Sequence, residues 1–163
     1  MTGLAEDEIE HTYRQYFQIL RQKCARMMRD PTEAQDVAQE TFVRLWSNRA
    51  DIGDARAVTA WLYRTSTRLA VDSYRRNRTR APFDDAHELI ERRSDEPDRL
   101  HACRLLERIA GRVPTRELEV AILSRLDELT HDEIGEVTGM SGRSVRRLLS
   151  KFDSRLARFR ERE

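Results

Sequence analysis

Residues 30–46 read DPTEAQDVAQETFVRLW, a run that carries its own signals for a helix. Asp30 stands where a helix N-cap belongs, Pro31 suits the first helical position, and Glu33 complements the positive end of the helix dipole. The apolar side chains then recur at helical steps: Ala34, Val37, Ala38, Phe42, Leu45 and Trp46. The stretch therefore predicts an amphipathic helix that starts after Asp30 and runs to about Asn48.

Helical patterns continue on both sides of this run. An apolar stripe at helical spacing precedes it: Ile9, Tyr13, Tyr16, Phe17, Leu20, Cys24, Met27 and Met28. After a break at residues 51–54, we expect a third helix from about Ala57 to Arg76, and three such helices can close one small core. Residues 100–110 begin a second helical unit with Gly111 as its C-terminal cap, and no segment alternates convincingly as a strand. The sequence thus predicts an all-α fold of two small helical domains.

The charge of the chain is strongly segregated, although its net value is only +1 over 163 residues. Residues 60–80 carry six arginines against one aspartate, and residues 140–163 carry eight basic side chains against three acidic ones. Between them, residues 82–98 carry seven acidic side chains against two arginines. Because arginine makes bidentate contacts with phosphate and guanine, the two basic segments favour nucleic acid as a partner.

Several classes of protein are disfavoured by what the sequence lacks. No apolar run approaches membrane-spanning length and no signal region is visible, so we expect no membrane insertion and a place in the cytoplasm. Cys24 and Cys103 lie at or beside apolar helical positions without metal-ligand spacing, so they are interpreted as core thiols, and neither metal nor cofactor is expected. None of the four histidines stands in a catalytic or metal-binding arrangement, and no glycine-rich phosphate loop occurs. The chain is therefore not expected to be an enzyme.

The C-terminal part predicts a helix-turn-helix. Thr130 and Glu133 form a capping box, Gly139 permits a tight turn, and Ser141 caps a last helix. The apolar stripe of that helix is Val145, Leu148, Leu149, Phe152, Leu156 and Phe159. The cap and the opposite face offer the side chains that a recognition helix presents to the major groove: Ser141, Arg143, Ser144, Arg146, Arg147, Ser150 and Lys151. The alternative for this segment is a basic helix that merely faces solvent.

The expected third helix has a core face and two further faces. Its core face carries Leu62, Ser66, Leu69 and Ser73, and the roughly opposite face carries Trp61, Arg64, Arg68 and Arg75, with Asp72 among them. Aromatic rings stack on unpaired bases and guanidinium groups hold the backbone, so the arginine face suits single-stranded DNA. Tyr63 and Tyr74 line a third direction, and Arg76 continues the basic run.

Residues 36–42, DVAQETF, together with Arg44 and Trp46, resemble the core-polymerase-binding helix of bacterial sigma factors, most of all the small extracytoplasmic-function class. The resemblance implies that core RNA polymerase contacts Asp36, Gln39, Glu40, Phe42 and Trp46, of which the two aromatic residues would be partly core. Trp61-Leu62-Tyr63-Arg64 and Leu69-Ala70-Val71-Asp72 are similar to the sigma-factor sequence that opens and reads the minus-ten promoter element. Minus-ten contacts are implied at Trp61, Tyr63, Arg64, Arg68, Tyr74, Arg75 and Arg76. Many family members have asparagine in place of Arg68, so no base preference is carried over.

Residues 113–120, VPTRELEV, resemble the start of the sigma-factor domain that binds the minus-thirty-five element, a similarity shared with LuxR-type regulators. With both sets of motifs in order, the resemblance implies three parts. Residues 1–80 would bind core polymerase and melt the minus-ten region, residues 81–98 would form an acidic flexible linker, and residues 99–163 would bind minus-thirty-five DNA through the helix-turn-helix. The implied partners are core RNA polymerase, promoter DNA and an anti-sigma factor, since no N-terminal autoinhibitory region is visible.

Two other functions remain open at this point. A LuxR-like regulator would bind duplex DNA as a dimer without a polymerase-binding helix, yet residues 1–80 show no receiver or ligand-pocket pattern. A sigma-like protein that binds polymerase without DNA would not need the two arginine faces. Binding to core polymerase and to duplex DNA would separate these alternatives.

Overall fold

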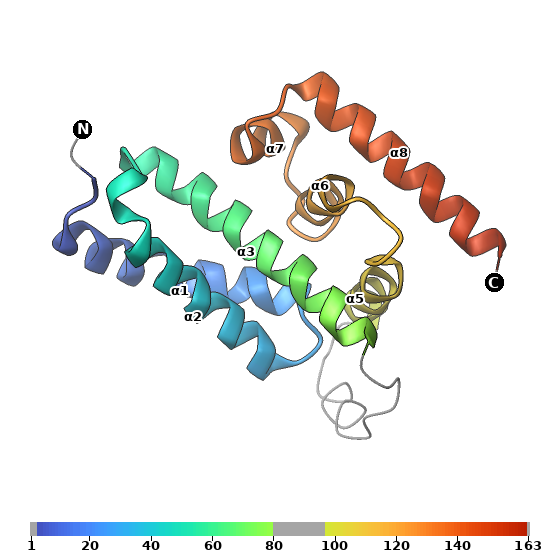
Figure 1. The fold of residues 1–163 in the computed structure, drawn as a ribbon, viewed down its shortest axis with the longest axis horizontal. Coiled ribbons are helices and arrows are strands. Elements are labelled where there is room, and N and C mark those ends of the chain that lie inside the picture. The colour runs from blue at the N-terminus through green and yellow to red at the C-terminus, as the bar shows by residue number, and fades with distance from the viewer. Residues whose placement is uncertain (1–2, 80–96, 163) are drawn as a thin grey trace.

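The computed structural model describes residues 3–79 and 97–162, and every regular element within these ranges is a helix (Figure 1). In chain order the elements are α1 (Glu6–Met27), α2 (Pro31–Ser47), the short 3₁₀ helix η1 (Arg49–Asp51), α3 (Ala55–Thr79), α5 (Pro97–Ile109), α6 (Thr115–Arg125), α7 (His131–Thr138) and α8 (Gly142–Glu161). The predicted all-α class is confirmed. Of the predicted acidic linker, residues 81–96 lie outside the described residues, and residues 97–98 belong to α5.

Helix starts follow the capping chemistry that the sequence predicts. The Asp30 carboxylate accepts a hydrogen bond of 2.9 Å from the backbone N–H of Thr32, and Pro31 opens α2. At the start of α7, the Thr130 hydroxyl accepts from the N–H of Glu133 at 3.2 Å, and the Glu133 carboxylate accepts from the N–H of Thr130 at 2.7 Å. In these three contacts a backbone N–H group at the start of a helix donates to a side chain only two or three residues away. The helix boundaries could therefore be predicted from the sequence.

The prediction of a glycine cap at Gly111 is wrong. Helix α5 ends at Ile109, and Gly111 is not among the residues with a positive φ angle. The carbonyl of Ile109 instead accepts from the N–H groups of Arg112 and Val113, at 2.8 and 3.2 Å. This tight turn needs no left-handed residue.

Helices α1, α2 and α3 form an N-terminal unit, named so below. Figure 1 shows α1 and α2 lying along α3, and their buried apolar side chains meet between them. Glu33, at the start of α2, accepts hydrogen bonds from the Ser73 hydroxyl and from the Asn77 amide of α3, the latter at 3.2 and 3.3 Å. The end of α3 is thereby fixed to the first turn of α2.

Helices α5 to α8 form a C-terminal unit around α6. Every residue from Glu117 to Leu123 is buried, because α6 lies between α3 on one side and α8 on the other (Figure 1). Helix α3 contacts α5, α6 and α7, and one apolar cluster extends from the N-terminal unit into α5, α6 and α8. A second cluster joins α6, α7 and α8. The two units are therefore packed directly against each other along α3.

Candidate functional site

One face of α2 combines acidic and apolar side chains in contact with solvent. Asp36, Gln39 and Glu40 are exposed, and Glu40 pairs with Arg44 one turn later, with Oε1 and Nε 3.1 Å apart. Val43 lies on the same helix and is 58% exposed. This face of α2 therefore sets an exposed apolar side chain among exposed carboxylates.

Trp46 and Phe42, the two aromatic residues predicted for this face, have different positions. Trp46 is 42% exposed, and the guanidinium carbon of Arg49 lies 4.2 Å from the centre of its ring. Phe42 is instead buried, with its ring centre 5.0 Å from Tyr13 and 5.9 Å from Phe17. Phe42 therefore supports the face from the core and does not present itself to a partner in this structure.

Val43 is an exposed residue of this face that the apolar pattern of the sequence does not predict. Its position falls outside the apolar stripe of α2, and that off-stripe placement was the available signal. A valine at a solvent-facing helix position gains nothing from burial in the folded chain.

Helices α7 and α8 form the predicted helix-turn-helix. Gly139 ends α7 in the left-handed region with φ of 75°, and the Ser141 hydroxyl accepts from the N–H of Ser144 at 3.2 Å to start α8. A Cβ atom at Gly135 would lie only 2.8 Å from the carbonyl oxygen of Met140. Glycine at that position is what lets α7 approach the turn so closely.

The outer surface of α8 carries the predicted reading residues. Six of these seven residues are exposed, namely the N-cap Ser141 together with Arg143, Arg146, Arg147, Ser150 and Lys151, while Ser144 is half-buried. The opposite side of α8 is anchored by Val145, Leu149 and Phe152 in the interior. A rigid basic helix face of this kind fits the major groove of duplex DNA.

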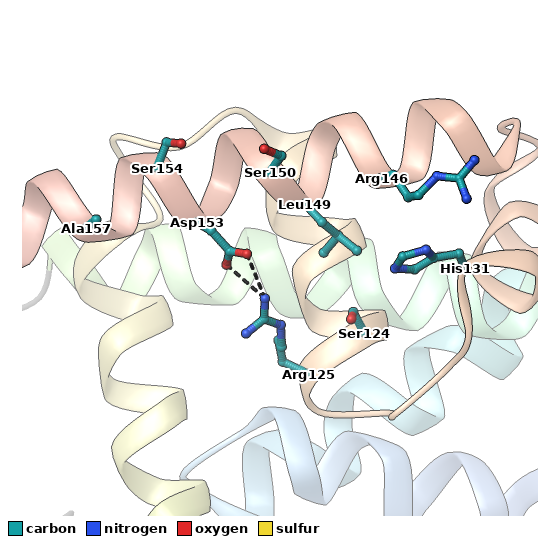
Figure 2. A pocket seen from close by; sticks show the side chains of 9 residues that line it. All are labelled: Ser124, Arg125, His131, Arg146, Leu149, Ser150, Asp153, Ser154 and Ala157. Atoms are coloured by element: carbon teal, nitrogen blue, oxygen red, sulfur yellow. Dashed lines mark hydrogen bonds and ion pairs between the residues drawn. The ribbon is translucent and has the colours of Figure 1, made fainter.

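A shallow hollow borders this surface where α8 passes the end of α6 and the start of α7 (Figure 2). In it, Arg125 is held against the Asp153 carboxylate, with nitrogen–oxygen distances of 2.9 and 3.0 Å. Figure 2 shows Arg146 extending past His131, away from that pair. Asp153 thus neutralises Arg125, while Arg146 is directed away from that carboxylate.

The arginine face of α3 lies against the C-terminal unit. Nη1 of Arg64 lies 3.3 Å from the carbonyl oxygen of Val137, and Nε of Arg75 lies 3.2 Å from that of Ala110. Nε of Arg68 lies 3.0 Å from Oε1 of Glu119. Partial burial and the neighbouring Arg68 charge lower the pKa of Arg64. All three predicted DNA contacts are occupied within the chain.

Three further predicted minus-ten residues of α3 differ in their exposure. Trp61 is half-buried against the main apolar cluster, and Tyr63 is half-buried against the second cluster. Arg76 is exposed. The predicted face is therefore brought together on one helix, but only part of it reaches solvent.

Tyr74 is a correction to the predicted minus-ten set. Its side chain is 0% exposed, and its hydroxyl donates a hydrogen bond to the backbone carbonyl of Met27. Burial raises its pKa well above the usual tyrosine value. Tyr74 follows Ala70 and Val71 by one helical turn, so it belongs to the side of α3 that faces α1.

A buried ionic cluster that the sequence did not predict joins α1 to the end of α6. The Lys23 ammonium pairs with the Asp127 carboxylate, and both side chains are 0% exposed. Nη2 of Arg26 lies 3.0 Å from the other Asp127 oxygen. Burial lowers the pKa of Lys23, and the Asp127 charge opposes that effect.

The approach of Asp127 depends on the turn after α6. Glu128 adopts φ of 55°, and the N–H of Leu129 donates to the carbonyl of Leu123 at 3.0 Å. A non-glycine residue in the left-handed region is uncommon. The run ELEVAIL signals only a separate ion pair, that of Glu119 with Arg68, because Glu119 lies among apolar residues and must be paired when buried.

Both cysteines are buried free thiols, which confirms their interpretation as core residues. Sγ of Cys103 lies 3.2 Å from the carbonyl oxygens of Arg26 and Met27. In the portion of the chain that the structure describes, no group of three or more His, Cys, Asp or Glu side chains is arranged to hold a metal. No helix among those residues is both long and apolar enough to cross a bilayer.

Comparison with known proteins gives a consistent assignment. Residues 12–80 match the family described as Sigma-70 region 2, and residues 103–151 match Sigma-70, region 4. The RNA polymerase sigma factor YlaC of Bacillus subtilis is 28% identical over 161 residues, which cover 94% of this chain and 88% of YlaC. The RNA polymerase sigma factor CnrH of Cupriavidus metallidurans is 30% identical over 138 residues, or 77% of this chain and 72% of CnrH. The ECF RNA polymerase sigma factor SigW of Bacillus subtilis is 28% identical over 129 residues, or 71% of this chain and 69% of SigW. This chain therefore belongs to the extracytoplasmic-function sigma factors of the sigma-70 family, which direct RNA polymerase to specific promoters for transcription initiation.

Proposed function

We propose that this sigma factor divides its work among three surfaces on one chain. In this proposal the exposed face of α2 binds core polymerase, the arginine face of α3 holds the melted minus-ten strand, and the outer face of α8 reads the minus-thirty-five duplex. The observation that carries it is the order of these surfaces, acidic and apolar first, aromatic and arginine-rich second, helix-turn-helix last. In this proposal the functional parts are residues 1–80 and residues 97–163, of which the second part begins with α5.

The polymerase-binding surface consists of Asp36, Gln39, Glu40 and Trp46, with Val43 added from the structure. Its acidic side chains supply charge complementarity for a basic partner, and the two exposed apolar side chains supply area to bury. Phe42 acts through packing behind them. In this proposal, contact with core polymerase buries the apolar side chains of Val43 and Trp46, which are exposed in the monomer.

The minus-ten surface consists of Trp61, Tyr63, Arg64, Arg68, Arg75 and Arg76, without Tyr74. Rings stack on unpaired bases with about 1–3 kcal/mol each, and arginines hold the phosphates. The energy of this binding is available only where the strands have parted. The helix would therefore favour the melted promoter over the closed duplex.

The minus-thirty-five surface consists of Ser141, Arg143, Ser144, Arg146, Arg147, Ser150 and Lys151. Arg143 and Arg147 are one helical turn apart near the start of α8 and are exposed, so they are placed to reach guanine edges. Ser141 and Ser144 lie at the helix N-terminus, where backbone donors favour a phosphate. The rest of the surface would position the helix.

In this proposal the chain performs no catalysis itself, since the polymerase supplies the chemistry. The sigma factor acts in the cytoplasm, where polymerase and promoter DNA are present. Family membership alone supports an anti-sigma factor as its regulator.

Run-off transcription tests the proposal. Core polymerase, with and without the full chain, is given a library of genomic fragments from the host, and the 5′ ends of the transcripts are mapped. We expect defined start sites that require the chain, preceded by a shared pair of sequence elements. Transcripts that start at the same places without the chain, or no transcripts with it, would contradict the assignment.

A further inference from the structure

We propose that Arg49 positions Trp46 for polymerase binding: its guanidinium covers one face of the indole ring and so presents the other face to the partner. The proposal rests on the function assigned above to the exposed face of α2. Arg49 lies in η1, just after that helix, and acts on polymerase through Trp46. Residues 3–4, at the start of the chain, fix Arg49 in turn.

Two contacts join Arg49 to Trp46. The guanidinium carbon lies over the ring, 4.2 Å from its centre, and Nη1 donates a hydrogen bond of 2.7 Å to the Trp46 carbonyl oxygen. The last carbonyl groups of a helix favour a nearby cation, so the end of α2 holds the guanidinium where it can cover the ring. Ring and guanidinium are thereby tied to the same stretch of backbone.

The two arginines near the end of α2 have different partners. Nε of Arg44 lies 3.1 Å from Oε1 of Glu40, so its charge is paired with a carboxylate. Arg49 is placed on an aromatic ring instead. A carboxylate partner would leave Trp46 free to rotate, whereas a cation over its face restrains the ring.

Trp46 is the exposed aromatic residue of the docking face, with 42% of its surface open to solvent. Ordering an exposed side chain at an interface costs conformational entropy, and a ring already held in its bound orientation avoids that cost. Tryptophan is also among the residues that carry most of the binding energy at interfaces. The effect of Arg49 should therefore appear in the affinity for polymerase, and only while Trp46 is present.

Residues 3–4 hold η1 in place. The N–H of Leu4 donates to the Arg49 carbonyl oxygen at 2.9 Å, and the Leu4 side chain is buried in the main apolar cluster. A Cβ atom on Gly3 would lie 2.4 Å from the Cα of Ala50 and 2.6 Å from the Arg49 carbonyl oxygen. Both are backbone atoms, so only glycine allows the segment to lie this close to η1. Figure 1 shows the N-terminal end of the chain beside the turn that joins α2 to α3.

A purely structural role for Arg49 makes a different prediction. An arginine that only caps the end of α2 would contribute to the stability of the helix and leave the affinity for polymerase unchanged. Charge alone predicts the opposite sign from positioning. The exposed carboxylates of α2 suit a basic partner, so loss of a positive charge near them should strengthen binding.

A double-mutant cycle on the full chain tests the proposal. Wild type, Arg49→Ala, Trp46→Ala and the double variant are compared for affinity to immobilised core polymerase by biolayer interferometry. We expect Trp46→Ala to weaken binding about 30-fold, as loss of an interface anchor does. Arg49→Ala should weaken binding about fivefold in the wild-type background and by less than about twofold in the Trp46→Ala background.

Three further variants support the comparison. Arg14→Ala is the matched control, because its side chain is 76% exposed and the same charge is removed from α1, so it should bind no more weakly than wild type. Arg49→Gln, which keeps a donor for the Trp46 carbonyl but lacks the charge, replaces Arg49→Ala if circular dichroism shows that the latter is unfolded. Gly3→Ala should weaken binding as Arg49→Ala does, and should lose its effect in the Trp46→Ala background.

Quenching of fluorescence by acrylamide checks the geometry without polymerase. The chain has two tryptophans, so a Trp61→Phe chain reports Trp46 alone. Arg49→Ala in that chain should raise the quenching constant, because the covered face of the ring becomes accessible. An unchanged quenching constant would contradict the contact.

The cycle separates failure of this proposal from failure of the docking face. If Arg49→Ala binds within about twofold of wild type, or loses equally in both backgrounds, the positioning role is wrong and the docking face stands. If Trp46→Ala itself binds like wild type, Trp46 is not part of the polymerase surface, and the positioning role falls with that assignment.

Discussion

Arg68 of α3 and Glu119 of α6 form an ion pair across the two units, with Nε 3.0 Å from Oε1. The two partners are not alike, since the Arg68 side chain is 58% exposed and that of Glu119 only 7%. Because Glu119 is buried, removal of its partner would leave an uncompensated carboxylate in the interior, so this pair holds α3 against α6.

Charge reversal on α2 should weaken binding to core polymerase. Asp36→Arg with Glu40→Arg replaces two exposed carboxylates at the proposed docking face, so like charges would meet the partner. The fold should persist, because changes at exposed positions cost under about 0.5 kcal/mol of stability. Binding is measured by biolayer interferometry on immobilised core polymerase. Glu6→Arg with Asp7→Arg on α1 is the matched control, and equal affinity for both double variants would remove α2 from the interface.

The recognition helix should divide into base-reading and phosphate-holding arginines. Alanine at Arg143 or Arg147 should cost about 1–3 kcal/mol and relax specificity at one definable base pair. Alanine at Arg158, Arg160 and Arg162, which follow the last fully buried residue of α8, should lower affinity for all sequences alike and flatten its salt dependence. The assay is binding of the full chain to promoter duplexes in which each base pair is varied in turn. If both sets of variants lose the same affinity on every duplex, α8 positions the protein on DNA without reading its sequence.

Glycine at position 135 should be essential to the helix-turn-helix. The added Cβ of Gly135→Ala would lie 2.8 Å from the Met140 carbonyl oxygen, so α7 must move away from the turn. We expect a loss of about 1–3 kcal/mol in the free energy of unfolding, together with weaker duplex binding. Urea titration measures the first effect. Gly142→Ala is the control, since its Cβ would meet only the Asp132 carboxylate at 3.8 Å, and an equal loss there would rule out the steric cause.

The buried thiols should make the chain less stable in alkali. Burial raises the pKa of Cys24 to about 12 and that of Cys103 to about 11, from 9.0 in the unfolded chain. Since the folded pKa values are higher, their contribution is complete below pH 9 and is lost as the pH rises toward 11 and 12. Each thiol should account for up to about 1.4 kcal/mol per pH unit in that window. Urea titrations between pH 8 and 10.5 should fall more steeply for wild type than for Cys24→Ala with Cys103→Ala, and parallel curves would contradict the shifts.

Local features of the sequence were sufficient to predict much of this architecture. Asp30, Thr130 and Ser141 each accept a hydrogen bond from a helix N–H group that lies two or three residues later. Because these partners are so near in sequence, the spacing of the residues alone predicts the contact. The turn at Gly139 is equally local, because its left-handed φ excludes most other residues. The local motifs also indicated the resemblance to sigma factors, which the comparisons with known proteins confirm.

The contacts between the two units could not be predicted in this way. Arg68 and Glu119 are 51 residues apart, and an arginine has the same sequence context whether it faces DNA or a carboxylate. Tyr74 was misassigned because helical spacing alone does not show whether the side of α3 that carries Tyr74 faces solvent or another helix. In the structure that side is buried. Asp127 gave no local sign, since its partners Lys23 and Arg26 lie in the first helix.

Run-off transcription on paired templates tests the division of labour between α3 and α8 most directly. One template is the linear promoter, and the other carries the same upstream duplex with the minus-ten region already held open as a mismatched bubble. Trp61→Ala with Arg64→Ala should fail on the linear template and recover on the bubble, because stacking of about 1–3 kcal/mol per base is needed to part the strands. Arg143→Ala with Arg147→Ala should stay impaired on both, since its duplex element is unchanged. A bubble that rescues neither variant, or both to the same extent, would contradict the assignment of strand opening to α3 and duplex reading to α8.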